Sequence, residues 1–361
     1  MKKDIGSIFP LTATDLSSSK DDVNIFKETI YNRIYFSLCR EAIYAVAKKY
    51  EKSKRVVLIP AYTCQTVIEP FEQQGWTYYF YDIKKNLRID AHNLLSLANI
   101  YHPTMIVVHP YYGMELNLDE LKVLYKIKQS GCILLEDLTQ CIYTDKRPDI
   151  FDYFVGSSRK WLKIPDGAFL ESTLPNESIE QPMIENASFI QKQIDAMYLR
   201  GKYFELGDEE IKSISIRISK EAAAAANNIK CHKMANFSKN ILAKGDISKY
   251  VEKRFSNYKY LFKHINACVG GIELACSCLE EVTTAPLYFP FYAEDRANLQ
   301  KALAKEHIYA PVLWPVNTDK VLINENIKYI YSHILAIPID QRYNLDDMCK
   351  ISDIINSVYE K

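Results

Sequence analysis

The sequence predicts an α/β protein built on a mainly parallel sheet, followed by a small α+β domain at its C-terminal end. Short β-branched or aromatic runs alternate with helix-length amphipathic stretches over the first half of the chain, as in βα units. The runs are continuously apolar, as expected for strands that helices cover on both faces. With 361 residues, 48% of them hydrophobic, the chain is long enough for a large core and two domains.

The expected strands and helices alternate in the order that βα units require. The predicted strands are residues 56–62, 78–83, 105–112, 133–138, 153–156 and 168–171. The predicted helices between and after them lie near residues 40–49, 65–74, 118–129 and 189–200.

The rest of the chain changes character. An alanine-rich segment after Lys220 is a strong helix former, and a polar helical stretch continues through residues 254–262. The segments 286–290 and 334–338, with a helix over 295–306, are typical of a small α+β domain. We therefore predict a large domain over 1–245 and a small domain over 246–361.

The composition favours small-molecule chemistry. Lys plus Arg and Asp plus Glu number 45 each, so no net charge attracts nucleic acid or an anionic membrane. The nine cysteines are scattered and predict reduced thiols, and no metal site is expected. No apolar run approaches the roughly 20 residues that span a bilayer. A cytoplasmic protein without nucleic-acid or membrane partners is the expectation.

The most informative segment is the apolar strand that ends in Asp137, with Gln140 after it and Lys160 downstream. Pyridoxal phosphate (PLP) requires an amine to hold it as a Schiff base, a carboxylate at its pyridine nitrogen and donors at its phosphate. Ligands of parallel sheets bind at the carboxyl ends of strands, where Asp137, Ser157 and the segments 60–63 and 109–113 are predicted to lie.

For each of these candidate residues, we give the role that it would have with the cofactor and the purely structural alternative. Lys160 would hold the cofactor and move the substrate Cα proton, and the alternative is a surface lysine. Asp137 would keep the pyridinium proton, and the alternative is a helix cap. Gln140 would hydrogen-bond the 3-hydroxyl, and the alternative is a solvent-facing residue in a first helical turn. Glu136 should point to the opposite face of the strand.

Two segments are candidates for the phosphate. Ser157 stands three residues before Lys160, close enough for its hydroxyl or amide to meet the phosphate. A helix predicted to begin near Cys39 and Arg40 offers backbone amides, a positive dipole end and a fixed charge. The alternative for this second segment is an ordinary amphipathic helix start.

At this point the sequence resembles a known family, the fold type I PLP-dependent aminotransferases of the DegT/DnrJ/StrS group. The resemblance rests on short segments along most of the chain, with Glu-Asp-Leu-Thr-Gln at 136–140 and Ser-Ser-Arg-Lys-Trp at 157–161 the most specific. The other segments that carry it are residues 39–43, 59–64, 81–83, 109–113, 254–258 and 335–339.

The resemblance implies a three-layer sandwich and a homodimer with shared active sites. It also implies a Schiff base at Lys160, a pyridinium contact at Asp137 and a ring contact at Gln140. The implied phosphate contacts come from Ser157 and from the amides around Cys39 and Arg40.

Several positions depart from the family pattern. Cys39 and Arg40 replace a glycine and a small hydroxyl residue, and Gly167-Ala168 replaces a glycine pair. Cys64 stands where an aromatic residue often stacks on the ring, so Tyr62 or Tyr112 is the expected substitute. Ser215 replaces an asparagine that contributes to the neighbouring subunit's phosphate site, and it keeps a hydroxyl with a shorter reach.

The leading functional hypothesis is an aminotransferase that moves an amino group from a donor such as glutamate to a keto or aldehyde acceptor. The expected acceptor is a sugar derivative in polysaccharide or secondary-metabolite biosynthesis. The alternatives are a PLP-dependent sugar dehydratase and a low-turnover PLP-binding regulatory or scaffold protein. The substrate candidates are Tyr111, Tyr112, Arg217 and Trp314.

Overall fold

A computed structural model describes residues 4–16, 32–144, 147–175, 178–265, 270–316, 321 and 324–359 of the chain. The chain forms two compact units. Unit 1 contains the described residues of Ser7–Glu51 and Asp152–Asp246, and unit 2 contains those of Asp4–Gly6, Lys52–Phe151 and Ile247–Lys361. The division into a large domain over 1–245 and a small domain over 246–361 stays a prediction.

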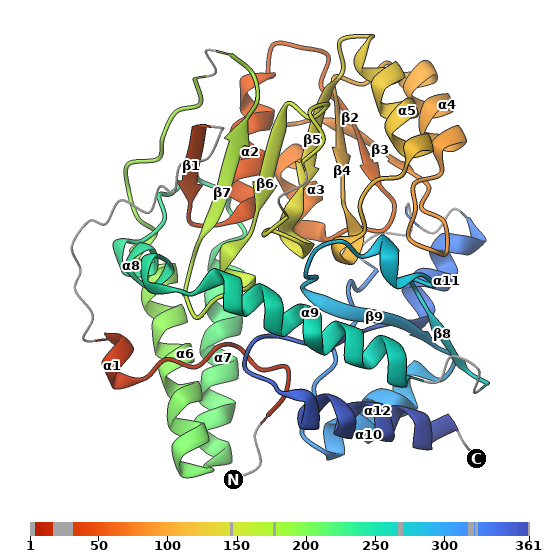
Figure 1. The fold of residues 1–361 in the computed structure, drawn as a ribbon. Coiled ribbons are helices and arrows are strands. Elements are labelled where there is room, and N and C mark those ends of the chain that lie inside the picture. The colour runs from red at the N-terminus through yellow and green to blue at the C-terminus, as the bar shows by residue number, and fades with distance from the viewer. Residues whose placement is uncertain are drawn as a thin grey trace. The chain divides into compact units, whose positions relative to one another are not determined.

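The fold is α/β, as predicted. It contains a seven-stranded, mixed but mainly parallel sheet with helices beside it, and a separate three-stranded antiparallel sheet (Figure 1). Within the described residues, no helix combines the length and the apolar character needed to cross a membrane.

Unit 2 contributes the parallel strands, in the spatial order β5-β4-β2-β3. The strands and their helices are β2 (Val56–Pro60), α3 (Gln65–Glu72), β3 (Thr77–Tyr81), α4 (Ala91–Tyr101), β4 (Met105–Val108), α5 (Leu118–Lys128) and β5 (Ile133–Asp137). The predicted strands and two of these helices are confirmed, and α4 was not predicted. Leu58 pairs with Ile106, and Ile106 with Leu134, so the register is continuous from β2 to β5.

Local chemistry sets where strand β4 ends and where helix α5 begins. Strand β4 stops at Val108, before the predicted end, because Pro110 has no N–H and Tyr112 adopts a left-handed φ of 49°. The resulting turn is the 3₁₀ helix η1 (Tyr111–Gly113). Helix α5 begins in a capping box, in which the Asn117 side chain and Glu120 satisfy each other's backbone amides.

The C-terminal half of unit 2 holds the second sheet, in the order β10-β9-β8 and antiparallel throughout. Its elements are α9 (Ile247–His264), β8 (Ile272–Leu274), η4 (Leu279–Glu281), β9 (Tyr288–Ala293), α10 (Arg296–Lys305), α11 (Glu325–His333), β10 (Ile334–Pro338) and α12 (Leu345–Tyr359). The predicted helix over 295–306 is confirmed as α10. The predicted apolar segments at 286–290 and 334–338 contribute β9 and β10.

Unit 1 contributes three antiparallel strands in the order β1-β7-β6. Its elements are α1 (Ala13–Leu16), β1 (Asn32–Phe36), α2 (Cys39–Lys49), β6 (Tyr153–Gly156), η3 (Ser158–Lys160), β7 (Ala168–Ser172), α6 (Ala187–Leu206), α7 (Glu209–Ala225) and α8 (Asn236–Lys244). The two long helices α6 and α7 pack side by side (Figure 1). Strand β1 was not predicted.

The N-terminal segment packs closely on α6 at a glycine. The Leu11 amide donates a hydrogen bond to the Met197 carbonyl over 3.0 Å, and Leu11 is fully buried. A Cβ atom at Gly201 would overlap the Leu11 carbonyl oxygen. Glycine in the interior of α6 is therefore explained by the close approach of another backbone.

Replacing this glycine tests that explanation. Although alanine favours a helix by about 1 kcal/mol over glycine, we expect Gly201→Ala to lower the free energy of unfolding by roughly 1–3 kcal/mol because the Leu11 backbone must move. Denaturant unfolding measures the change. Gln191→Ala, at an exposed position of the same helix, should stay within about 0.5 kcal/mol of wild type. A stabilised Gly201→Ala protein would contradict the packing argument.

Candidate functional site

In unit 2, polar side chains gather after the carboxyl ends of β2, β4 and β5. Asp137, the last residue of β5, is 7% exposed, and its Oδ1 accepts a 2.9 Å hydrogen bond from the Thr139 amide. Its Oδ2 lies 3.8 Å from His109 Nδ1, and His109 Nε2 lies 2.8 Å from Thr63 Oγ1. The carboxylate is thus held by a backbone donor and faces a buried imidazole. These four residues form the Asp137 cluster.

The sequence predicts that His109 lies near a strand end but does not indicate a role for it. A histidine directly after a buried strand, one strand away from the acid, is the signal that could have found it. Its ring is oriented by Thr63, so the side chain that approaches Asp137 is fixed from the other side.

Gln140 has one half of its amide engaged and the other half unpaired. The side-chain Oε1 of Gln140 accepts a 2.9 Å hydrogen bond from the Tyr112 backbone amide. The backbone carbonyl of Gln140 accepts another from the Leu287 amide, also at 2.9 Å. Its Nε2 is buried and has no hydrogen-bond partner among the described residues. A buried amide donor without a partner costs about 1–3 kcal/mol, so this nitrogen is suited to an acceptor on a bound molecule.

The predicted ring-stacking and substrate residues of unit 2 form an aromatic cluster. The fully buried Tyr62 ring stacks on Tyr111, with centroids 5.3 Å apart, and lies 5.0 Å from the half-buried Trp314. The Tyr62 hydroxyl donates to the Leu313 carbonyl, so in the 3.1 Å contact between Tyr62 and Tyr112 the hydroxyl of Tyr112 is the donor. Burial raises the pKa of both phenols. Whether either tyrosine stacks on a cofactor stays a prediction.

In unit 1, Lys160 ends the short helix η3 that follows β6. Its side chain is half-buried, and its amine forms no hydrogen bond or ion pair with the described residues. Lys163, three residues on, instead pairs with Asp15. Ser157 is buried, and its carbonyl accepts a 3.4 Å hydrogen bond from the Lys160 amide. An amine without a partner among the described residues is available to a ligand.

One glycine links this segment to the start of α2. The Gly167 amide donates to the Ser37 carbonyl at 2.8 Å, and the Gly167 carbonyl accepts from the Arg159 amide at 3.1 Å. Gly167 has a φ of +137°, which side chains rarely tolerate. The Lys160 segment and the helix start at Cys39 are therefore joined through a single residue.

The start of α2 carries the other phosphate candidates. Leu38 is the N-cap and has no side-chain oxygen to cap the first turn. Arg40 is half-buried, and its Nη1 donates to the Ala226 carbonyl at 3.5 Å. The positive end of the helix dipole thus begins at Cys39, as predicted for an anion site. An anion bound there stays a prediction.

A buried acid that the sequence reasoning overlooked stands beside this segment. Asp166 is fully buried, accepts a 3.0 Å hydrogen bond from the Ala235 amide and accepts another from the Ser238 hydroxyl. Burial raises the pKa of Asp166 to about 7, against these hydrogen bonds, which lower it. Asp166 precedes Gly167, so its protonation state bears on the backbone that joins α2 to the Lys160 segment.

Asp166 should make the stability of the protein pH-dependent. Its pKa is raised from 3.8 in the unfolded chain to about 7 in the fold, so its contribution is fully present below pH 3.8 and is lost as pH rises through about 7. The melting temperature of the wild-type protein should therefore fall as pH rises through this range. We expect the Asp166→Asn variant to lack the part of this fall that is due to Asp166. Asp195→Asn, at an exposed position of α6, should keep the wild-type profile. Identical pH profiles for Asp166→Asn and wild type would refute the assignment.

Two candidates on α7 are engaged differently. Ser215 is fully buried, and its hydroxyl donates to the Ala196 carbonyl of α6 at 2.7 Å. Arg217, two residues on, is exposed, as expected because residues i and i+2 of a helix do not share a face. Ser215 could reach a neighbouring subunit only by breaking its bond to α6.

Within the part of the chain that the structure describes, no group of three or more His, Cys, Asp and Glu side chains is placed to hold a metal ion. The eight described cysteines are free thiols. Cys268 lies outside the described residues.

The fold has relatives among solved structures. The Helicobacter pylori aminotransferase PseC, involved in the biosynthesis of pseudoaminic acid, aligns over 99% of this chain and 100% of its own, with 13% identity and a TM-score of 0.66. The sugar aminotransferase CalS13 from Micromonospora echinospora aligns over 90% of this chain and 87% of its own, with 15% identity and a TM-score of 0.64.

A third relative was solved with its cofactor. NtdA from Bacillus subtilis, with bound cofactor PMP, aligns over 91% of this chain and 73% of its own, with 17% identity and a TM-score of 0.65. No protein-family model matches the chain, and no curated protein matches it. At these identities the similarity establishes the fold. The chain therefore has the fold of the DegT/DnrJ/EryC1/StrS aminotransferases.

Proposed function

We propose that this protein is a PLP-dependent aminotransferase. The observation that carries the proposal is the Asp137 cluster at the end of β5, with the unpaired amide nitrogen of Gln140 beside it in the sequence. The half-buried Lys160, whose amine has no partner among the described residues, supports it. The donors and acceptors present fit the cofactor, because a carboxylate suits its ring nitrogen, an amide donor its phenolic oxygen and an amine its aldehyde.

When bound, PLP supplies an electron sink for the charge left on the substrate Cα. Asp137 would keep a proton on the ring nitrogen, and the Thr139 amide orients its carboxylate by donating a hydrogen bond to Oδ1. His109, fixed by Thr63, would restrict the Asp137 side chain to one orientation. Lys160 would bind the cofactor and then move a proton at the substrate Cα.

The phosphate would lie at the start of α2. Backbone amides around Cys39, the guanidinium of Arg40 and the hydroxyl of Ser157 are the donors that we propose for it. Ser215 is a weaker candidate, because its hydroxyl is already bonded to Ala196.

The acceptor that we propose is a keto or aldehyde sugar derivative, with glutamate or a similar amino acid as donor. The relatives named above support this choice, since CalS13 is described as a sugar aminotransferase and PseC as an enzyme of pseudoaminic acid biosynthesis. A role in polysaccharide or secondary-metabolite biosynthesis, a cytoplasmic location and a homodimer belong to the same proposal. Tyr111, Tyr112, Arg217 and Trp314 remain the proposed substrate residues.

The first test is covalent attachment. Wild-type protein mixed with PLP should develop a visible absorption band, and borohydride should fix the cofactor to the Lys160 peptide, as detected by mass spectrometry. Lys160→Ala should lose both signals because its side chain has no amine. Lys163→Ala, which removes a nearby lysine paired with Asp15, should keep both. A reducible band in Lys160→Ala would disprove the assignment of this lysine.

The second test concerns the proton on the ring. We expect Asp137→Asn to bind PLP but to slow amine transfer from glutamate by about 100-fold or more, because a neutral amide does not stabilise a pyridinium. Single-turnover absorbance measures the rate. Asp119→Asn, an exposed change on α5, should match wild type. A rate for Asp137→Asn within about threefold of wild type would exclude this role.

A further inference from the structure

Unit 2 contains a cavity on the Glu136 side of β5. Its volume is about 440 Å³, which lies in the range of small-molecule sites. Glu136 lines it, whereas Asp137, the next residue of the strand, does not. Consecutive strand residues point to opposite faces, so the cavity is separate from the Asp137 cluster.

Glu136 lines the cavity and carries a buried acceptor that the described residues do not satisfy. Glu136 is 2% exposed, and its Oε2 has no hydrogen-bond partner among the described residues. A buried carboxyl oxygen without a donor costs about 1–3 kcal/mol, and more when it is charged. A ligand that brings a donor or a positive charge to Oε2 would remove this cost.

The carboxyl groups around the cavity favour a cation. Glu115, Glu136 and Asp149 line it, against the single positive side chain of Arg147. Glu115 Oε1 accepts from the Thr283 hydroxyl, and Asp149 Oδ1 accepts from the Tyr125 hydroxyl, each at 2.6 Å. Two of the three carboxyls therefore have protein donors, and Glu136 is the one whose oxygen remains for a ligand.

Part of the remaining wall is apolar. Met114, Leu116 and Leu121 line the cavity beside the acidic groups. A ligand that matches this lining has a charged head and a hydrocarbon body of a few carbon atoms.

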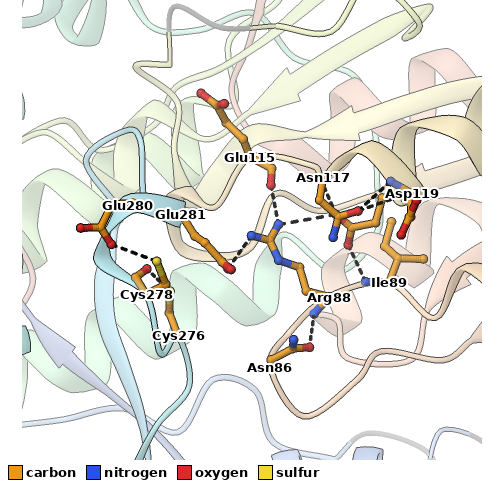
Figure 2. A network of polar contacts seen from close by, with 11 residues as sticks. Asn86, Arg88, Ile89, Glu115, Asn117, Asp119, Cys276, Cys278, Glu280 and Glu281 are labelled. Carbon is orange, nitrogen blue, oxygen red and sulfur yellow. Dashed lines mark hydrogen bonds and ion pairs between the residues drawn. The ribbon is translucent and has the colours of Figure 1, made fainter.

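A polar network around Arg88 fixes these walls (Figure 2). The Arg88 guanidinium donates to Glu281 at 2.6 Å and to the Glu115 carbonyl, and it lies 3.5 Å from Glu120. Glu120 in turn accepts from the amides of Asn117 and Ile89, each at 2.7 Å. The turn containing Glu115, the start of α5 and the η4 segment are thereby tied to one side chain, so the cavity is preformed.

We propose that this cavity binds a small organic cation, an ammonium or guanidinium group on a short apolar body, with the Glu136 carboxylate as its counter-ion. The site is separate from the proposed PLP chemistry and does not depend on it. On binding, the protonated Glu136 carboxyl loses its proton to solvent, and the resulting carboxylate pairs with the cation.

The electrostatics of Glu136 support this proton release. Burial raises its pKa to about 8; Arg147 lowers it, and Asp137 raises it. The neighbouring Cys141 thiol, whose pKa burial raises well above its usual range, is uncharged at neutral pH. Glu136 is therefore mostly protonated at pH 7, and cation binding should strengthen as pH rises towards about 8.

The probe is n-butylguanidinium, with n-butylurea as its neutral counterpart of the same shape. A guanidinium is chosen because a primary amine would also react with an aldehyde cofactor. Calorimetry on the full-length protein, with and without PLP, should give a Kd for n-butylguanidinium at least about tenfold below that for n-butylurea at pH 8. Towards lower pH the affinity should fall by up to about tenfold per unit. Buffers of different ionisation enthalpy should report a released proton.

Variants locate the interaction. Glu136→Gln should weaken n-butylguanidinium binding by about tenfold or more and abolish the pH dependence of binding. Asp119→Asn is the corresponding acid-to-amide substitution on an exposed part of α5. It should leave the affinity and its pH dependence unchanged. Equal affinities for the two probes, or an unaltered Glu136→Gln protein, would overturn the proposal. If Glu136→Gln does not fold, probe discrimination and proton release in the wild-type protein decide the question.

Discussion

Strand β5 ends in two consecutive buried carboxyls, and the rest of the functional architecture depends on how the fold accommodates them. Burying a carboxyl is expensive unless a donor or a charge compensates it. The Asp137 carboxylate accepts a hydrogen bond from the Thr139 amide and lies close to the His109 ring. None of the described residues donates a hydrogen bond to Glu136 Oε2, and burial raises the pKa of Glu136 to about 8. Because consecutive side chains of a strand point to opposite faces, these two neighbouring acids lie in different surroundings and have different chemistry.

The same constraint explains why aromatic residues surround the strand ends. Tyr62, Tyr111 and Tyr112 are fully or almost fully buried, and their hydroxyls are satisfied within the protein, partly by backbone carbonyls. Such a shell excludes water and strengthens each electrostatic contact made by a bound molecule. The proposed cofactor chemistry relies on this low-dielectric surrounding, whereas none of these three tyrosines lines the cavity proposed as the cation site.

Local patterns carried much of the fold and some of the site. The apolar runs predicted β2, β4, β5 and β6, and the strand ends placed Asp137 and Ser157 where the structure has them. By contrast, β1 reads Asn-Arg-Ile-Tyr-Phe, and its strand conformation depends on pairing with β7, more than 130 residues away. The burial of Asp166 was not predicted either, because its hydrogen-bond donors, Ala235 and Ser238, lie far from it in the sequence. Contacts between distant segments leave no periodic signal.

By itself, the sequence determined the α/β class, the order of the strands along the chain and the residue types that suit PLP, because these follow from periodicity and side-chain chemistry. Only the tertiary structure decided that His109 is fixed between Thr63 and Asp137, that Gln140 keeps a buried donor unpaired and that Glu136 faces a cavity. The physical reason is that burial and hydrogen-bond partners are properties of assembled neighbours, and a one-dimensional pattern does not contain them.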